Sequence, residues 1–174
     1  MHKLLAALKR LFLRLEAPDA STDDPLPPIP FTKPKRAVHS VFLHCSASDH
    51  AHHDNAETLR QWHVVDRGWS DIGYHFLISF DGKLHKCRPL SRTPAAQRGH
   101  NTGSIAICLS GGQNGKANAF TPRQYDTLLR LCAGINKAYA GRVTFHGHNE
   151  VANKACPVYD YRYILDLDDN GVML

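Results

Sequence analysis

Residues 38–44 read VHSVFLH, a short apolar run that ends in a histidine. β-Branched and aromatic residues favour strands, and an apolar run of this length between polar residues is typical of a buried strand. A second run, SIAICLS at residues 104–110, has the same character and is followed by Gly111 and Gly112. The two runs predict buried strands of one central sheet.

The residues between these runs predict a helix followed by a hairpin. The helix is expected over residues 56–67 and should end at Gly68. Its inward face is formed by Leu59, Trp62 and His63. YHFLISF (74–80) and KLHKC (83–87) flank Asp81-Gly82, and this dipeptide suits a type I′ hairpin turn. Residues 88–103 should then form a long polar loop.

The second half of the chain predicts a further helix and strand. Thr121-Pro122-Arg123-Gln124 combines a capping threonine, a proline at the first helical position and a glutamine that completes a capping box. This helix should run to about Ala140, with Leu128, Leu129, Cys132 and Ile135 facing inward. RVTFH (142–146) predicts a short strand, and a last helix is expected after Cys156-Pro157. Strands that alternate with helices predict a mixed α/β domain around one central sheet.

Two segments precede this domain. Residues 1–16 read MHKLLAALKRLFLRLE, with the apolar side chains on one helical stripe and most basic residues off it. Such a helix suits a transient contact with an anionic membrane surface, or docking on its own domain or on a partner. Residues 17–36 hold six of the ten prolines, which predicts an extended linker. The folded domain is therefore expected over residues 37–174.

The composition excludes several classes of protein. The five cysteines are spread out and form no CxxC pair, so a reducing compartment is favoured over a disulfide framework. No apolar run approaches the ~20 residues of a membrane span, and LLAAL (4–8) is too short for the ~7–15-residue core of a signal peptide. The net charge is +5, but Lys and Arg are not clustered in the folded part, so no nucleic-acid partner is expected. We expect a monomer made in the cytoplasm.

Twelve histidines direct attention to metal binding. His44 ends the first strand, and His148 and Cys156 lie together in HNEVANKACP (148–157). Imidazoles and a thiolate suit Zn²⁺, and three protein ligands leave a fourth position for water, as in catalytic zinc sites. Zinc lowers the pKa of bound water to ~7 and can polarise a carbonyl, and amide hydrolysis needs both effects. On spacing alone, the same residues also fit a buried apolar cysteine and two ordinary histidines.

Other residues compete with this trio or support it. His146 would share a face with His148 if the strand continued, so it is the second choice as a ligand. Glu150 could serve as a base, but a supporting hydrogen bond is the favoured role. His75 is expected in the core or the sheet. The three histidines at positions 50, 52 and 53 are expected on an exposed loop.

Several motifs occur in order along the chain. They are VFLHCSAS (41–48), LRQWHVVDRGWSDIGYHF (59–76), DGKL (81–84), GSIAICLSGG (103–112), the TPRQ helix start (121–124) and HNEVANKACP (148–157). Together they resemble the type 2 N-acetylmuramoyl-L-alanine amidases, the family of the amidase-type phage lysozyme, whose relatives include peptidoglycan recognition proteins. The resemblance extends over residues 37–165 and implies a central mixed sheet flanked by helices, with zinc at one end of a cleft.

This resemblance implies roles for five residues. It makes His44, His148 and Cys156 the zinc ligands, and it matches Tyr74 and Lys154 to the family's catalytic residues. A tyrosine hydroxyl beside zinc-bound water can accept, relay or hold its proton. A lysine ammonium can stabilise the oxyanion that forms when water attacks a carbonyl.

The implied reaction is hydrolysis of the amide bond between N-acetylmuramic acid and L-alanine in peptidoglycan, as in cell-wall lysis by an endolysin. Such an enzyme, made without an evident signal peptide, would act on the wall after release or delivery. The alternative is a non-catalytic peptidoglycan recognition module. Relatives of that kind have typically lost a metal ligand, often the cysteine, whereas all the expected ligands are present here.

One position departs from the family pattern. Many relatives carry a histidine that contacts substrate in the loop before the third strand, and here Ala96 stands in its place. The neighbouring residues that could compensate as substrate contacts are Gln97, Arg98, His100 and Asn101.

Overall fold

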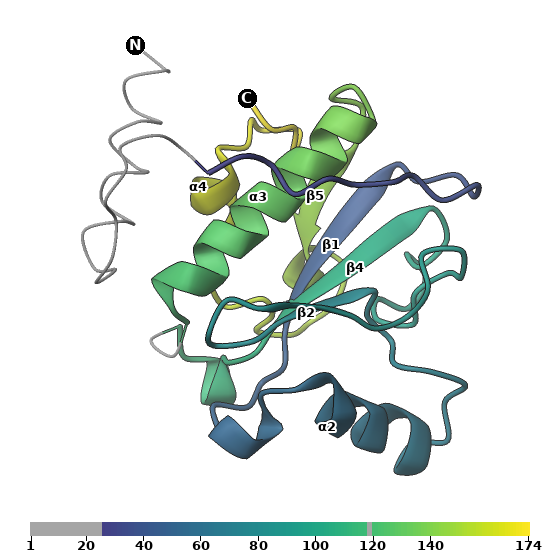
Figure 1. Ribbon diagram of the computed structural model, residues 1–174, viewed down its shortest axis with the longest axis vertical. Helices are drawn as coiled ribbons and strands as arrows, with labels where there is room; N and C mark the ends of the chain where they lie inside the picture. Colours follow the sequence, from purple (N-terminus) through teal and green to yellow (C-terminus); the bar gives the residue numbers. More distant parts are fainter. Residues whose placement is uncertain (1–25, 118–119) are drawn as a thin grey trace.

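The computed structural model describes residues 26–117 and 120–174. The predicted helix at residues 1–16 and the first part of the proline-rich segment lie outside these residues. The described part contains five strands: β1 (Ser40–Cys45), β2 (Phe76–Ile78), β3 (Leu84–Lys86), β4 (Ser104–Leu109) and β5 (Thr144–Gly147). They form one sheet in the order β3-β2-β4-β1-β5 (Figure 1). Only β3 is antiparallel to its neighbour, so the predicted central mixed sheet is confirmed.

Three α-helices accompany the sheet: α2 (Ala56–Arg60), α3 (Pro122–Ala138) and α4 (Tyr161–Leu165). A π-helical turn, η2 (Gln61–Val65), continues α2, and three short 3₁₀ turns are η1 (Ala51–His53), η3 (Gln113–Gly115) and η4 (His148–Glu150). The run of α2 and η2 stops before Gly68, whose φ of 68° favours glycine, as predicted. No helix among the described residues has the length and apolar character needed to cross a membrane.

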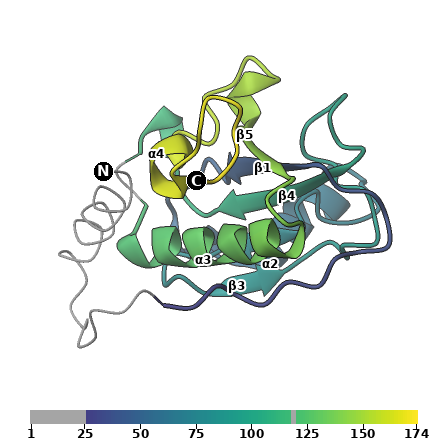
Figure 2. The same cartoon turned by 90° about the horizontal axis from the view of Figure 1, so that it is seen from above.

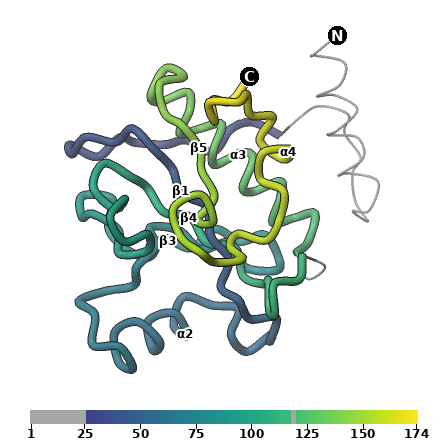
Figure 3. Tube along the Cα trace, turned by 180° about the vertical axis from the view of Figure 1, so that it is seen from behind, coloured from purple at the N-terminus to yellow at the C-terminus, as the bar shows by residue number. Residues whose placement is uncertain are grey.

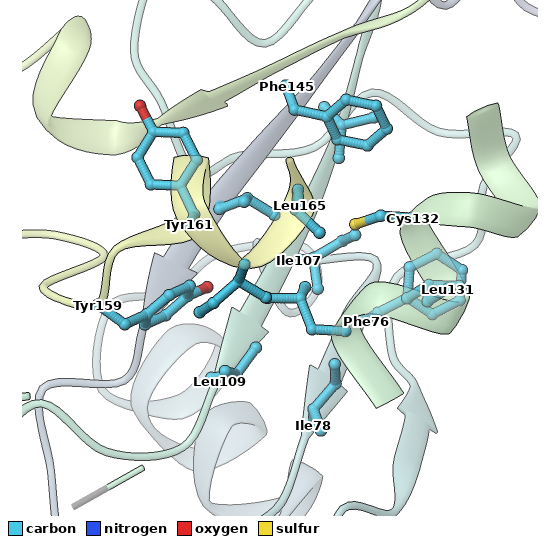
Figure 4. Close-up of a cluster of buried hydrophobic side chains, with 14 of the residues drawn as sticks. Phe76, Ile78, Ile107, Leu109, Leu131, Cys132, Phe145, Tyr159, Tyr161 and Leu165 are labelled. Atoms are coloured by element: carbon cyan, nitrogen blue, oxygen red, sulfur yellow. The ribbon is translucent and has the colours of Figure 1, made fainter. Parts of the chain in front are cut away.

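The helices α3 and α2 cover opposite faces of the sheet. Side chains alternate along β4, so successive residues of this strand contact one helix and then the other. Ile107 and Leu109 face α3 and α4 in the large core cluster drawn in Figure 4, together with Cys132 and Leu165. Cys108, between them, packs instead with Leu59 of α2. Figures 1 and 2 show α3 lying along one side of the strands. A side chain on β1 or β4 therefore reaches either the α3 face or the α2 face according to its parity.

The helix α3 begins as predicted. Thr121 caps it, with Gln124 completing a reciprocal capping box and Pro122 at its start. Three of the four predicted inward residues are fully buried, whereas Leu129 is only half-buried. Leu131 is buried instead, since the inward face of α3 is wide enough to contact both the sheet and α4.

The hairpin between β2 and β3 is confirmed, but its predicted turn type is wrong. The Gly82 amide donates to the Ser79 carbonyl, so Phe80 and Asp81 are the central residues of the turn. Gly82 has a φ of 82°, whereas Asp81 is not among the residues with positive φ. A type I′ turn needs positive φ at both central positions, and the observed pattern is a turn followed by a left-handed glycine. The Ser79 hydroxyl also donates to Asp81, which favours this longer connection.

The described part of the proline-rich segment packs on the domain. The Ile29 amide donates to the Arg130 carbonyl on α3 at 3.0 Å. Phe31 lies with its ring centroid 6.5 Å from that of Phe76 and 6.3 Å from that of Tyr139. Gly134 permits this approach, because a Cβ there would meet the Ile29 carbonyl oxygen. Prolines predict the extended backbone, but they do not predict where its apolar side chains bind.

Candidate metal centre

Two neighbouring parallel strands bring His44 and His148 to the same edge of the sheet. β1 and β5 pair with Leu43 opposite Gly147. His44 is the next residue of β1, and His148 directly follows β5 as the first residue of η4. The carboxyl edge of parallel strands is where α/β sheets generally bind ligands. The two imidazole centroids are 4.7 Å apart. His44 points away from α3, since its neighbours Leu43 and Cys45 both belong to the α3 core.

Cys156 reaches this edge from the loop after β5, which folds back beside the end of β1 (Figure 3). The Asn149 amide donates to the Cys156 carbonyl at 2.7 Å, and the Cys45 amide donates to the Cys156 Sγ at 3.3 Å. The Cys156 Sγ lies 3.8 Å from the His44 Nδ1. The potential ligand atoms of His44, His148 and Cys156 all lie within 4.8 Å of one another. Among residues 26–117 and 120–174, this is the only such group with a geometry suited to a metal ion.

The protonation of the two histidines fits a metal. Burial lowers the pKa of His44 to about 3, and the neighbouring His148 and Lys154 add to this effect. Burial, followed by the charge of Lys154, also lowers the pKa of His148. Both imidazoles are therefore neutral near pH 7, which is the form that coordinates a metal.

The Cys156 thiol can also bind a metal, but unlike the two imidazoles it must first lose a proton. The side-chain hydrogen bond with the Cys45 thiol, followed by burial, raises the pKa of the Cys156 thiol, and these effects outweigh the opposite effect of the Cys45 backbone amide. A metal must therefore displace the thiol proton on binding, as is usual for cysteine ligands. Two neutral imidazoles and one displaceable thiol proton are the donor set that zinc prefers.

The two predicted catalytic residues lie beside this group. The Tyr74 ring centroid is 5.1 Å from that of His44 and 5.5 Å from that of His63. Burial, with a further contribution from nearby cysteines, raises the pKa of Tyr74, so its hydroxyl keeps its proton at neutral pH. Lys154 is exposed, and its charge acts on both imidazoles of the group.

The competing residues have other partners. The His146 Nδ1 is 2.7 Å from Glu150 and its Nε2 is 2.8 Å from the Thr144 hydroxyl, so it does not join the group. Glu150 accepts hydrogen bonds from the Gly147 amide and the Tyr161 hydroxyl. It supports the turn that carries His148, as expected.

His75 is buried in the sheet, as predicted. Its Nδ1 accepts from the Ala106 amide at 3.0 Å, and its Nε2 lies 3.0 Å from the Arg92 carbonyl. Both ring nitrogens are therefore engaged with the backbone.

The loop of predicted substrate contacts divides into two kinds of residue. Gln97 is completely buried, with its Oε1 3.1 Å from the His44 Nε2. Its side chain contacts His44 and Ser104 and has no exposed surface to offer a substrate, which corrects the expectation for this residue. The Asn101 Oδ1 accepts from the amides of Ala96 and Gln97 and thereby shapes the loop. Arg98 and His100 are exposed, and their role as substrate contacts stays a prediction.

Two supporting residues were not found from the sequence. The Tyr159 hydroxyl donates to the His44 carbonyl at 3.3 Å, and Cys45 contacts Cys156 through its amide. Cys45 lies within the motif VFLHCSAS and Tyr159 lies just after HNEVANKACP, but a tyrosine after Cys-Pro or a cysteine after a strand histidine carries no pattern of its own. Only the fold brings them to the site.

Comparison with known proteins agrees with this geometry. The family model described as N-acetylmuramoyl-L-alanine amidase matches residues 34–159. The chain belongs to this family. It is 38% identical over 133 residues to an endolysin of Enterobacteria phage T3, covering 75% of this chain and 87% of that protein. A Drosophila melanogaster peptidoglycan-recognition protein, SC2, is 30% identical over 104 residues, covering 58% of this chain and 55% of that protein.

A solved endolysin structure has a similar fold. The endolysin Ph2119, from a bacteriophage of Thermus scotoductus MAT2119, matches with a TM-score of 0.66 and 29% identity, covering 79% of this chain and 86% of that one. The predicted fold class of the amidases and peptidoglycan recognition proteins is therefore confirmed.

Proposed function

We propose that this protein is an amidase that hydrolyses the bond between N-acetylmuramic acid and L-alanine in peptidoglycan, and that it depends on zinc. Membership of the amidase family and the similarity to phage endolysins support the reaction. The observation that carries the metal dependence is the convergence of His44, His148 and Cys156 within 4.8 Å. When bound, zinc lowers the pKa of water and polarises a carbonyl.

The protein's own residues supply the rest of the chemistry. His44 and His148, neutral and at the edge of the sheet, would hold the metal together with the Cys156 thiolate. The protonated Tyr74 hydroxyl can hold the attacking water by a hydrogen bond or share its proton. The Lys154 ammonium can stabilise the negative charge that develops on the amide oxygen as water adds to it. It can do so from the open side of the site, because it is exposed while the ligands are buried.

The alternative is a peptidoglycan recognition module without catalysis, since such proteins are among the relatives. Retention of the complete His-His-Cys group favours the enzyme, because simple recognition would not require it. Peptidoglycan is the partner in both cases. We propose that the protein acts on the cell wall, as endolysins do, after it has been made in the cytoplasm. The membrane contact through residues 1–16 and the monomeric state stay predictions.

The test is product analysis on purified peptidoglycan. The protein is assayed as isolated, after metal removal by a chelator, and after zinc is returned. We expect new L-alanine amino termini without new reducing sugars, lost on chelation and restored by zinc. New reducing sugars would indicate a glycosidase. Binding to peptidoglycan without release of any terminus would favour the recognition module.

A further inference from the structure

Gln97 is the one predicted substrate contact that the fold buries completely, and its side chain is engaged at both ends. Its Oε1 lies 3.1 Å from the His44 Nε2, and its Nε2 lies 2.7 Å from the Ser104 hydroxyl. The Ser104 hydroxyl in turn donates to the Asn101 carbonyl at 2.7 Å. The Asn101 side-chain oxygen accepts a hydrogen bond from the backbone N–H of Gln97, which completes the network.

The donor and the acceptor of each hydrogen bond in this network can be assigned by starting from the Asn101 carbonyl. The Asn101 carbonyl can only accept, so the single hydroxyl proton of Ser104 is used there. The Ser104 oxygen must then accept from the Gln97 side chain, which makes the contacting atom the amide nitrogen. The Gln97 oxygen therefore faces His44 as an acceptor, and the His44 Nε2 must carry the proton. The His44 Nδ1 is left with its lone pair directed toward Cys156, 3.8 Å away.

We propose that Gln97 is a positioning residue that fixes the tautomer and the ring orientation of His44, so that Nδ1 is presented to the metal. The proposal rests on the proposed zinc dependence of the amidase. Metal-bound histidines generally donate their second ring N–H to such a partner, and losing the partner typically costs ~10–100-fold in metal affinity. Here the partner is an amide whose own orientation is set by Ser104 and Asn101.

The structure offers a matched pair of variants for the test. Gln97→Met removes the acceptor while keeping the length and approximate volume of the side chain. Gln124→Met is the control, because Gln124 is equally buried and donates to the carbonyls of Ile78 and Ser110, far along the chain from the ligands. Gln97→Glu keeps an oxygen facing His44, with the Ser104 hydroxyl turned to donate to the second carboxylate oxygen, and serves as the rescue.

The first readout is zinc affinity, measured by competition with a chromophoric chelator. We expect Gln97→Met to bind zinc ~10–100-fold more weakly than the wild type. Gln124→Met should bind zinc with wild-type affinity, even if its unfolding midpoint falls. Gln97→Glu should recover most of the affinity. Wild-type zinc affinity in a folded Gln97→Met would overturn the proposal.

The second readout is the tautomer of His44 in the metal-free wild-type protein, from the ¹⁵N shifts of its ring nitrogens by NMR. It needs no variant, so a Gln97→Met protein that fails to fold does not remove the test. We expect the proton on Nε2, and a proton on Nδ1 would overturn the proposal. Neither readout uses peptidoglycan. If both agree with expectation and no protein releases alanine, the proposed reaction fails while the role of Gln97 stands.

Discussion

The histidines at residues 50–53 and the pair His44 and His148 differ less in spacing than in surroundings. The ring centroids of His50, His52 and His53 lie 4.0 to 5.4 Å apart, and those of His44 and His148 lie 4.7 Å apart. His50 and His52 are exposed on the turn that precedes α2, whereas His44 and His148 are buried.

The surroundings decide which group can hold a metal. His44 is fixed by Gln97 at its ring and by Tyr159 at its carbonyl, and a buried thiol faces its free nitrogen. In the group at residues 50–53, His53 is half-buried and its Nδ1 lies 2.8 Å from the Ser48 hydroxyl. Closely spaced imidazoles alone therefore do not make a metal centre. A metal centre also requires burial, orienting partners and convergent ligand atoms.

The largest expected effect comes from Cys156→Ser, because a neutral hydroxyl is a poor zinc ligand. Zinc affinity should fall by more than the ~10–100-fold that is typical for loss of a supporting partner, and alanine release should fall with it. His52→Ala is the control in the other histidine group and should retain both properties. Alanine release by Cys156→Ser at the wild-type rate would remove Cys156 from the metal site.

Lys154→Ala tests whether Lys154 contributes to catalysis without contributing to zinc binding. We expect alanine release to fall by ~10²–10³-fold, the usual loss when one group that stabilises an oxyanion is removed. Zinc affinity should stay near the wild-type value, because Lys154 is exposed and is not among the convergent ligands. Lys116→Ala, at another exposed lysine, is the control. A parallel loss of zinc would make Lys154 structural instead.

His75 is a buried histidine outside the metal site, so its burial should affect the pH dependence of stability without affecting zinc binding. Its folded pKa is lowered to about 4 by burial, from 6.5. The unfolded chain therefore binds more protons between these pH values, and stability is lost as the pH falls through this window. His75→Gln should weaken that dependence by up to ~1.4 kcal/mol per pH unit. Urea unfolding at pH 7 and pH 5 measures it, and an unchanged slope would contradict the assignment.

The smallest effect is expected from replacing His50, His52 and His53 together by alanine. Surface substitutions of this kind usually change stability by ~0.5 kcal/mol or less each, and loss of the Ser48 contact should add little. The stoichiometry of zinc binding and the rate of alanine release should be unchanged. A loss of one equivalent of zinc would mean that the exposed group also binds metal.

Much of the fold follows from local patterns. The apolar runs of β1 and β4 and the capping box of α3 act within a few residues, so the sequence predicts them directly. The turn after Ser79 was mispredicted because Asp81-Gly82 suits several turns, and the Ser79 hydroxyl helps to choose among them. The packing of Phe31 on the core could not be predicted either, because it depends on a contact distant in sequence.

The candidate site likewise contains residues that local motifs predict and a residue whose position depends on contacts distant from its motif. His44, His148 and Cys156 were predicted from motifs and are brought together at the end of parallel strands. The sequence makes Gln97 a candidate substrate contact because it follows Ala96, which stands where many relatives carry a histidine that contacts substrate. Its actual position depends on the network through Ser104 and Asn101, which no spacing in the sequence reveals.

The most direct test of zinc-dependent amide hydrolysis is a titration of metal-free protein with zinc, following alanine release from peptidoglycan at each step. If one zinc ion at His44, His148 and Cys156 supports catalysis, release is absent without zinc, rises linearly with added zinc, and reaches a plateau at one zinc per chain. Full release by the metal-free protein, or a plateau only at two zinc ions per chain, would contradict it.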